Sequence, residues 1–373
     1  MTPSARSCGP ILLSLAILAG CGGDAASPTA PADPRANALN MRLLAHVDFM
    51  GLTAQTGVRG SGNWGYTGRN GRRFALTGTS VGLSIDEVTT PTQPRHMALI
   101  AAPASSWREV KTYGEFAYVT TEAVHGLDVV DLRDPDRPVK VQTWSETFAS
   151  AHTVCVDDAR GLLFVNGTRN AARADSGMRI LSVADDPAHP REIGSFTSFY
   201  VHDCVVRGNR LYASAIFNGF LAVLDIADPA HPREITRFAT GHRFTHNSWP
   251  TTDGRYLFTT DEVADAPLEG WDLADLLKPV KVSEYLGRAG TIPHNVLVDG
   301  QRLLVAHYLE GVHLLDIADP ARPRLIGRYD TFPDEPAGVV FDGVWGAYIF
   351  PGSDLIVASD MTSGLFVLQY TGR

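Results

Sequence analysis

The sequence predicts an all-β fold, a single seven-bladed β-propeller that begins near residue 40 and runs to the end of the chain. One phrase recurs along the chain, with close copies at residues 126–144, 219–238 and 311–329 and weaker copies at 82–100, 177–196 and 271–286. The prolines that close these phrases are spaced by 44, 52, 42, 47 and 44 residues and are Pro94, Pro138, Pro190, Pro232, Pro279 and Pro323. A repeat of about 40–50 residues is typical of propeller blades.

Each repeat divides into four short strands. In the copy that begins at His294, HNVLVDG is expected to form the innermost strand, RLLVAHY the second, GVHLLDI the third and RLIGRY the outermost. These runs are too short and too rich in Val, Ile, Leu and Tyr to form helices. The stretch DGQ provides a tight turn between the first two strands, and Pro320 fixes the backbone in the turn before the fourth.

The ring is expected to close with the N-terminal part of the chain. The last repeat, at residues 344–370, supplies only three strands, VWGAYIF, LIVASD and GLFVLQY. The stretch NMRLLAHVDF at 40–49 has the pattern of an outermost strand but lacks the three strands that should precede it. We therefore expect residues 40–49 to complete the last blade, which leaves only short, protected strand edges.

Residues 1–20 have the pattern of a signal peptide. Arg6 precedes the apolar stretch PILLSLAILAG, which is too short to span a bilayer, and the segment ends in LAGC, which resembles the lipobox of bacterial lipoproteins. We expect Cys21 to be lipidated and to begin a flexible tether, residues 21–39, that leads to the propeller at 40–373. The protein would then be exported and lipid-anchored to the cell envelope, at the outer membrane or cell surface. The alternative is an ordinary secretory signal in which Cys21 is incidental.

Composition argues against a nucleic acid partner, and the cysteine content leaves open whether a disulfide forms. With 44% hydrophobic and 20% charged residues, the chain has the composition of a soluble globular protein. Its net charge of −9 provides no basic surface for a phosphate backbone, so no nucleic acid partner is expected. Cys155 and Cys204 could form a disulfide in an exported protein or remain two buried thiols.

Four consecutive repeats start their innermost strand with histidine. These residues are His152, His202, His246 and His294. Since the innermost strands of a propeller surround its axis, the four imidazoles are expected to gather at one mouth of the central channel. Neutral imidazole suits transition metals such as Fe, Cu or Zn, so the pattern predicts a shared metal or ligand site. The alternative is a polar channel mouth that holds ordered water.

Other polar residues are expected on the same face of the disc, either beside the histidines or in the loops after the second strands. The predicted ligand-binding residues are Arg108, Glu122, His125, Asp203, Asn247, Asp261, Glu262, Asn295 and His307. Carboxylates among them could orient the imidazole N–H groups. Arg108 occupies the histidine position of a neighbouring blade, where its charge would oppose a metal and favour an anionic ligand such as a carboxylate or phosphate. No GxSxG, Walker loop, helix-opening GxGxxG or HExxH motif is present.

The repeated phrase also resembles a known sequence repeat. GLDVVDLRDPDRP (126–138) and GVHLLDIADPARP (311–323) resemble the LVIVD repeat of exported bacterial proteins. Together with SAHTV (150–154), FTHNSWP (244–250) and IPHNVLVDG (292–300), they make the chain similar to the choice-of-anchor B family over about residues 45–370. This resemblance implies a surface or secreted propeller with an attachment device, here the lipobox, and no assigned reaction.

A more distant similarity concerns chemistry. The stretch PHNVLVDGQRLLVAHY resembles the blades of selenium-binding proteins of the methanethiol oxidase type, and carotenoid cleavage oxygenases hold iron with four axial histidines in a seven-bladed propeller. The metal positions implied by this similarity are His152, His202, His246 and His294. We therefore expect a non-catalytic surface lipoprotein that binds a small anionic ligand or a surface protein. The alternative is a metal-dependent oxidase or oxygenase with a four-histidine centre.

Overall fold

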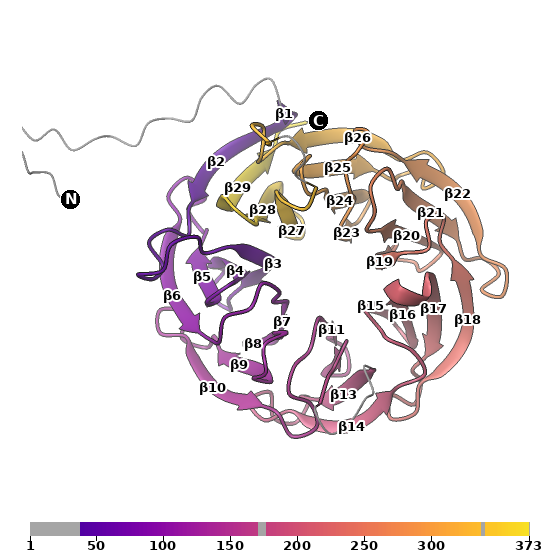
Figure 1. The fold of residues 1–373 in the computed structure, drawn as a ribbon, viewed down its shortest axis with the longest axis horizontal. Coiled ribbons are helices and arrows are strands. Elements are labelled where there is room, and N and C mark those ends of the chain that lie inside the picture. Colours follow the sequence, from indigo (N-terminus) through magenta and orange to yellow (C-terminus); the bar gives the residue numbers. More distant parts are fainter. Residues whose placement is uncertain (1–37, 171–176, 337–339, 373) are drawn as a thin grey trace, which may run out of the picture. The chain divides into compact units, whose positions relative to one another are not determined.

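The computed structural model describes residues 38–170, 177–336 and 340–372. These residues form seven antiparallel sheets arranged as blades around a central axis, so the predicted seven-bladed propeller is confirmed (Figure 1). The described part of the chain contains no helix that is long and apolar enough to cross a lipid bilayer. The predicted signal peptide, Cys21 and nearly all of the predicted tether lie outside the described residues.

The blades follow one another along the chain, and the first strand of each lies nearest the axis (Figure 1). The first three blades comprise β3 (Gly60–Thr67), β4 (Arg73–Thr79), β5 (Gly82–Glu87) and β6 (Arg95–Ala101); β7 (Val110–Tyr113), β8 (Phe116–Val119), β9 (Leu127–Asp131) and β10 (Val139–Trp144); and β11 (Val154–Asp157), β12 (Leu162–Val165), β13 (Met178–Ser182) and β14 (Arg191–Phe196). The next three comprise β15 (Asp203–Arg207), β16 (Arg210–Ala215), β17 (Phe220–Asp225) and β18 (Arg233–Ala239); β19 (Thr245–Pro250), β20 (Tyr256–Asp261), β21 (Leu268–Asp272) and β22 (Val280–Tyr285); and β23 (Val296–Asp299), β24 (Arg302–Ala306), β25 (Val312–Asp316) and β26 (Arg324–Tyr329).

The seventh blade combines both ends of the described chain. Its first three strands are β27 (Val344–Ile349), β28 (Leu355–Asp360) and β29 (Gly364–Tyr370). Its outer strand is β2 (Met41–Val47), which pairs antiparallel with β29. The predicted closure by residues 40–49 is therefore confirmed (Figure 1).

A shorter N-terminal strand, which the sequence did not predict, joins the neighbouring blade. Strand β1 (Ala38–Leu39) pairs with β26 and becomes a fifth strand of the sixth blade. Asn40, which separates β1 from β2, has a φ of 48° and donates from its side chain to the carbonyl of Ile326 at 2.8 Å. The N-terminal segment thus ties the sixth and seventh blades together.

The hydrophobic core lies between the facing surfaces of adjacent blades. Between the first and second blades, for example, Phe74 and Leu76 on β4 pack in one cluster with Ala117 on β8 and Val130 on β9. All four side chains are fully buried. Burial of a large apolar side chain contributes roughly 1.5–3 kcal/mol. Because every blade is held on both sides in this way, the innermost strands are placed firmly around the axis.

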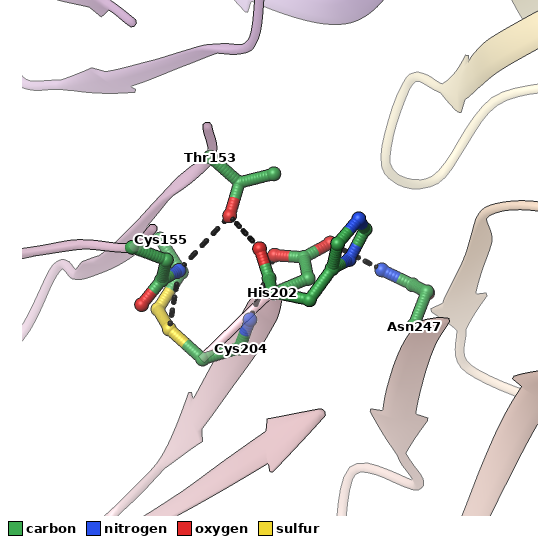
Figure 2. The surroundings of a disulfide bond; sticks show 7 residues. Thr153, Cys155, His202, Cys204 and Asn247 are labelled. Atoms are coloured by element: carbon green, nitrogen blue, oxygen red, sulfur yellow. Dashed lines mark hydrogen bonds between the residues drawn. A yellow bond between two sulfur atoms is a disulfide. The ribbon is translucent and has the colours of Figure 1, made fainter. Parts of the chain in front are cut away.

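A disulfide links two of these innermost strands. Cys155 on β11 is bonded to Cys204 on β15, with 6.0 Å between their Cα atoms (Figure 2). The sequence left this pairing open, and the structure resolves it. The crosslink spans 49 residues of sequence and is expected to stabilise the fold by about 2–4 kcal/mol, chiefly by restricting the unfolded chain. It lies directly beside His202, at the start of the fourth blade (Figure 2).

Candidate functional site

The four equivalent histidines form a continuous arc of rings at one mouth of the channel. The ring centroids of His152 and His202 are 4.3 Å apart, those of His202 and His246 are 4.4 Å apart, and those of His246 and His294 are 4.2 Å apart. Their positions in the repeat explain the arrangement, since each histidine lies at or just before the start of an innermost strand. The expected gathering of the four side chains is therefore present.

Hydrogen bonds between neighbouring blades hold the backbone of this arc. The hydroxyl of Thr153 donates to the carbonyl of His202 at 2.6 Å (Figure 2). The hydroxyl of Thr260 donates in the same way to the carbonyl of His294, also at 2.6 Å. The backbones of His202 and His294 are thus each anchored to the preceding blade.

The Nδ1 atoms of two histidines bond to backbone carbonyls of the next blade. His202 Nδ1 lies 3.0 Å from the carbonyl oxygen of His246, and His294 Nδ1 bonds to the carbonyl oxygen of Trp345. A carbonyl oxygen can only accept, so Nδ1 carries the proton in both rings. In a neutral imidazole the other nitrogen, Nε2, then has a free lone pair, which is the state in which imidazole binds a metal.

A carboxylate lies between the last two histidines. Glu262, which follows β20, places Oε2 3.7 Å from Nε2 of His246 and Oε1 3.7 Å from Nε2 of His294. The hydroxyl of Tyr308 donates to Oε1 at 2.6 Å. Burial, followed by the charge of Glu262, raises the pKa of Tyr308 well above its usual range, so this hydroxyl remains a donor. At the other end of the arc, His152 Nδ1 lies 2.9 Å from Oε1 of Glu122.

Burial keeps the inner rings of the arc uncharged. It lowers the pKa of His246 to about 3, with a further contribution from the charge of His152, and it lowers the pKa of His294 to about 3, with a further contribution from His246. The pKa of His202 is also well below its usual value, first because of burial and then because of its neighbour His246. Burial alone would raise the pKa of Glu122, but the hydrogen bond and charge of His152 outweigh it and lower that pKa.

A cavity of about 430 Å³ opens over the arc. Its polar lining includes His152, His202, His246, Glu122 and Glu262. Its aromatic lining consists of Trp107, Tyr200, Phe217, Phe244, Tyr308, Phe341 and Trp345. Phe217 and Phe341 are 69% and 53% exposed, so they form an open apolar rim. The cavity therefore combines an apolar wall with a small set of imidazole and carboxylate groups.

Three predicted ligand residues line a second, smaller cavity. Asp203, Asn247 and Asn295 each follow a histidine of the arc and line a narrower cavity together with Glu109 and Lys111. Asn247 Nδ2 donates to Oδ2 of Asp203 at 2.6 Å. Burial raises the pKa of Asp203 to about 6, although the charge of Lys111 opposes this. These residues form a polar network below the aromatic cavity and do not line it.

Comparison with known sequences supports the repeat. Residues 106–144, 200–240 and 293–331 match the family model of the LVIVD repeat. The chain carries three LVIVD repeats. They span most of the second, fourth and sixth blades, and the last two begin just before His202 and His294. No curated protein sequence matches the chain significantly.

Comparison with solved structures supports the fold of this LVIVD-repeat propeller. One similar crystal structure is that of a proposed 6-phosphogluconolactonase from Bacteroides fragilis NCTC 9343, with a TM-score of 0.57 and 10% sequence identity. The alignment covers 81% of this chain and 86% of that one. At this identity the similarity shows the fold alone.

The sequence predicted that Arg108 would place a positive charge beside the four histidines, and the structure of the LVIVD propeller shows that it does not. Its side chain is buried, and it donates from Nε to the carbonyl of Thr79 at 2.7 Å and from another guanidinium nitrogen to the carbonyl of Pro103. Burial lowers its pKa to about 10. The guanidinium therefore satisfies backbone carbonyls beside the first blade. Arg169, which follows β12 and was not predicted, lines the cavity instead.

Asp261 and Glu262, at the end of β20, point their side chains in opposite directions. The Asp261 carboxylate accepts from the hydroxyl of Thr240 at 2.6 Å and so holds the connection between β18 and β19, whereas the next residue, Glu262, lines the cavity. In the following blade, His307 is absent from the cavity lining and Tyr308 is part of it. Successive side chains of an extended strand alternate in direction, which explains both pairs. Asp261 and His307 therefore do not line the cavity, although they follow second strands as predicted.

His307 and His125, which were also predicted to bind a ligand, make contacts outside the cavity. His307 packs on the ring of His313, with centroids 5.0 Å apart, and His313 Nε2 lies 3.3 Å from Oε2 of Glu310. His125 Nε2 bonds to Oδ1 of Asp128 at 2.9 Å. Neither His125 nor His307 lines the aromatic cavity. His125 is held by its hydrogen bond to Asp128, and His307 packs on His313.

The aromatic wall was missed because most of it comes from loops. Phe217 lies on a short 3-10 helix, η2 (Ile216–Asn218), and Phe341 precedes β27. The sequence feature that could have predicted this wall is the presence of Phe in loops that follow a second strand or precede an innermost strand. All such loops of a propeller open on the same face as the histidines.

The buried His307 should make the unfolding free energy depend on pH. Burial, followed by the charge of His313, lowers the pKa of His307 to about 4, compared with about 6.5 in an unfolded chain. Between these pH values the unfolded state binds a proton that the folded state does not, so stability falls as the pH falls. In urea unfolding, the loss between pH 7 and pH 5 should be about 2 kcal/mol smaller in His307→Gln than in the unmodified protein.

The control is His231→Gln, because His231 lies on the surface with its side chain 82% exposed. It should retain the pH dependence of the unmodified protein. An unchanged pH dependence in His307→Gln would show that the folded state protonates His307 as readily as the unfolded state does.

Proposed function

We propose that this LVIVD-repeat propeller is an exported, lipid-anchored protein that binds a small ligand in the cavity over the histidine arc. The observation that carries the proposal is the cavity itself. Its volume of about 430 Å³ lies within the range of about 300–1,000 Å³ that is usual for small-molecule sites. Its combination of aromatic walls with a few convergent polar groups is also usual for such sites.

The lining indicates the chemical class of the ligand. Phe217, Phe244 and Phe341 offer an apolar surface to a flat or aliphatic group, and Arg169 offers a positive charge. A molecule with an apolar body and one anionic group fits both features when that group lies against Arg169 and away from the carboxylates of Glu122 and Glu262.

An aromatic sulfonate probe, 8-anilinonaphthalene-1-sulfonate, can test the cavity by fluorescence titration. We expect saturable binding to the purified protein and about fivefold weaker binding to Phe217→Ala, since loss of its ring removes roughly 1 kcal/mol of apolar contact. Arg169→Gln should also weaken binding. The matched control is Leu277→Ala, because Leu277 is equally exposed at 69% but does not line the cavity. Equal binding by all three variants and the unmodified protein would reject the proposed site.

The proposed location rests on the lipobox-like sequence that ends at Cys21. In the native host, Cys21→Ser should move the protein from the membrane fraction to the soluble fraction, because the residue that carries the lipid is lost. Cys8→Ser is the control and should remain with the membranes. Persistence of Cys21→Ser in the membrane fraction would contradict the lipid anchor.

A second candidate function is that of a metal-dependent oxidase or oxygenase. The observation that favours it is the orientation of the imidazoles, since two Nδ1 atoms are occupied by backbone carbonyls and the Nε2 lone pairs remain free. The four rings lie side by side along an arc, however, and His294 is not part of the cavity lining. This arrangement supports a metal centre made by a smaller set than all four histidines.

A further inference from the structure

We infer that His246, His294 and Glu262 together bind one divalent transition-metal ion. The inference deepens the proposed function, because His246 and Glu262 line the proposed ligand cavity, so that a bound ligand could reach the ion. Its evidence, however, comes from the three residues themselves and does not depend on the identity of the ligand. Among the described residues, this is the group of three whose ligand atoms all lie within 4.8 Å of one another.

The distances suit an ion after small movements. Each Nε2 atom lies 3.7 Å from an oxygen of Glu262. Metal–ligand bonds of about 2.0–2.2 Å place neighbouring ligand atoms about 3 Å apart. Modest rotations of the carboxylate and rings would therefore bring all three groups to one ion.

The strongest argument is a buried, unpaired nitrogen that faces a carboxylate oxygen. The Nδ1 proton of His294 is donated to the carbonyl of Trp345, so Nε2 of the neutral ring presents a lone pair. That Nε2 is fully buried, has no hydrogen-bond partner and faces a carboxylate oxygen at 3.7 Å, which is too long for a hydrogen bond. Two acceptors that face each other in a buried site repel, and an unpaired buried polar atom costs about 1–3 kcal/mol. A cation between them would give Nε2 a partner and would remove the repulsion from the carboxylate oxygen, which already accepts from Tyr308.

The surrounding groups fix the orientation of this donor set. Tyr308 donates to one oxygen of Glu262 at 2.6 Å, and the carbonyl of Trp345 holds the ring of His294. Such contacts to the outer atoms of metal ligands are usual, because they set the tautomer of the imidazole and the direction of the carboxylate. The ligands themselves come from the inner strands of two adjacent blades, around β19, β20 and β23, which are held by the core.

The donor set also indicates the kind of metal. Two imidazoles and one carboxylate, with remaining positions open, suit Fe(II), and Zn(II) accepts the same ligands. Neither cysteine of the described chain is available as a thiolate, because Cys155 and Cys204 form a disulfide. His152 is paired with Glu122, and His202 lies beside the trio as a packing neighbour. The inferred site therefore differs from the four-histidine centre suggested by sequence similarity.

The test uses the purified full chain after treatment with a chelator, titrated with Co(II) and followed by calorimetry and visible absorption. We expect one Co(II) per chain, with affinity lowered by more than about 100-fold in Glu262→Gln and in His246→Gln. The matched control, His152→Gln, should bind Co(II) within about threefold of the unmodified protein. Circular dichroism and melting temperature establish that each variant is folded.

Two results would overturn the inference. One is the absence of stoichiometric Co(II) binding to the unmodified protein, and the other is an equal loss of affinity in His152→Gln and His246→Gln, which would indicate a centre made by the whole arc. Titration of the same samples with 8-anilinonaphthalene-1-sulfonate separates the two proposals. Probe binding without metal binding would reject only the metal site, whereas metal binding without probe binding would reject only the proposed ligand cavity.

Discussion

The Nδ1 atom of His202 donates a hydrogen bond across the gap between two blades to the carbonyl of His246, and His294 does the same to Trp345. Because a carbonyl only accepts, these bonds fix one tautomer and leave the Nε2 lone pair of each ring available. Burial then keeps the rings neutral. The proposed metal site depends on this constraint at His294, since a ring that carried its proton on Nε2 could not bind an ion there.

The same constraint explains why the LVIVD propeller tolerates several buried histidines side by side. Charged imidazoles 4.2–4.4 Å apart would repel strongly in a buried setting, whereas neutral rings pack on one another as aromatic groups. The disulfide between Cys155 and Cys204 and the threonine hydroxyls between blades keep the inner strands in register around them (Figure 2). The stability of the propeller and the arrangement of the histidines at its channel mouth thus depend on the same few contacts near the axis.

The sequence was sufficient for features that the repeat specifies. Alignment of the copies predicted seven blades, the closing strand at 40–49 and the equivalence of the four histidines, since the same position in each copy takes the same place around the axis. Side-chain direction at the irregular ends of strands was harder to predict. Asp261 and Glu262 are adjacent and chemically alike, yet only Glu262 lines the cavity. The direction of Arg108 and the aromatic wall depend on loops that differ between copies, so no repeat pattern encodes them.

The tautomers of His202 and His294 can be measured directly by long-range ¹H–¹⁵N correlation NMR on metal-free protein labelled at histidine, at neutral pH. Signals are assigned with His202→Gln and His294→Gln. The structure predicts that both rings are neutral, with the proton on Nδ1 and an unprotonated Nε2. Protonation of Nε2 in His294, as the other neutral tautomer or as imidazolium, would contradict the account of the metal site, and the other neutral tautomer of His202 would contradict its hydrogen bond to His246.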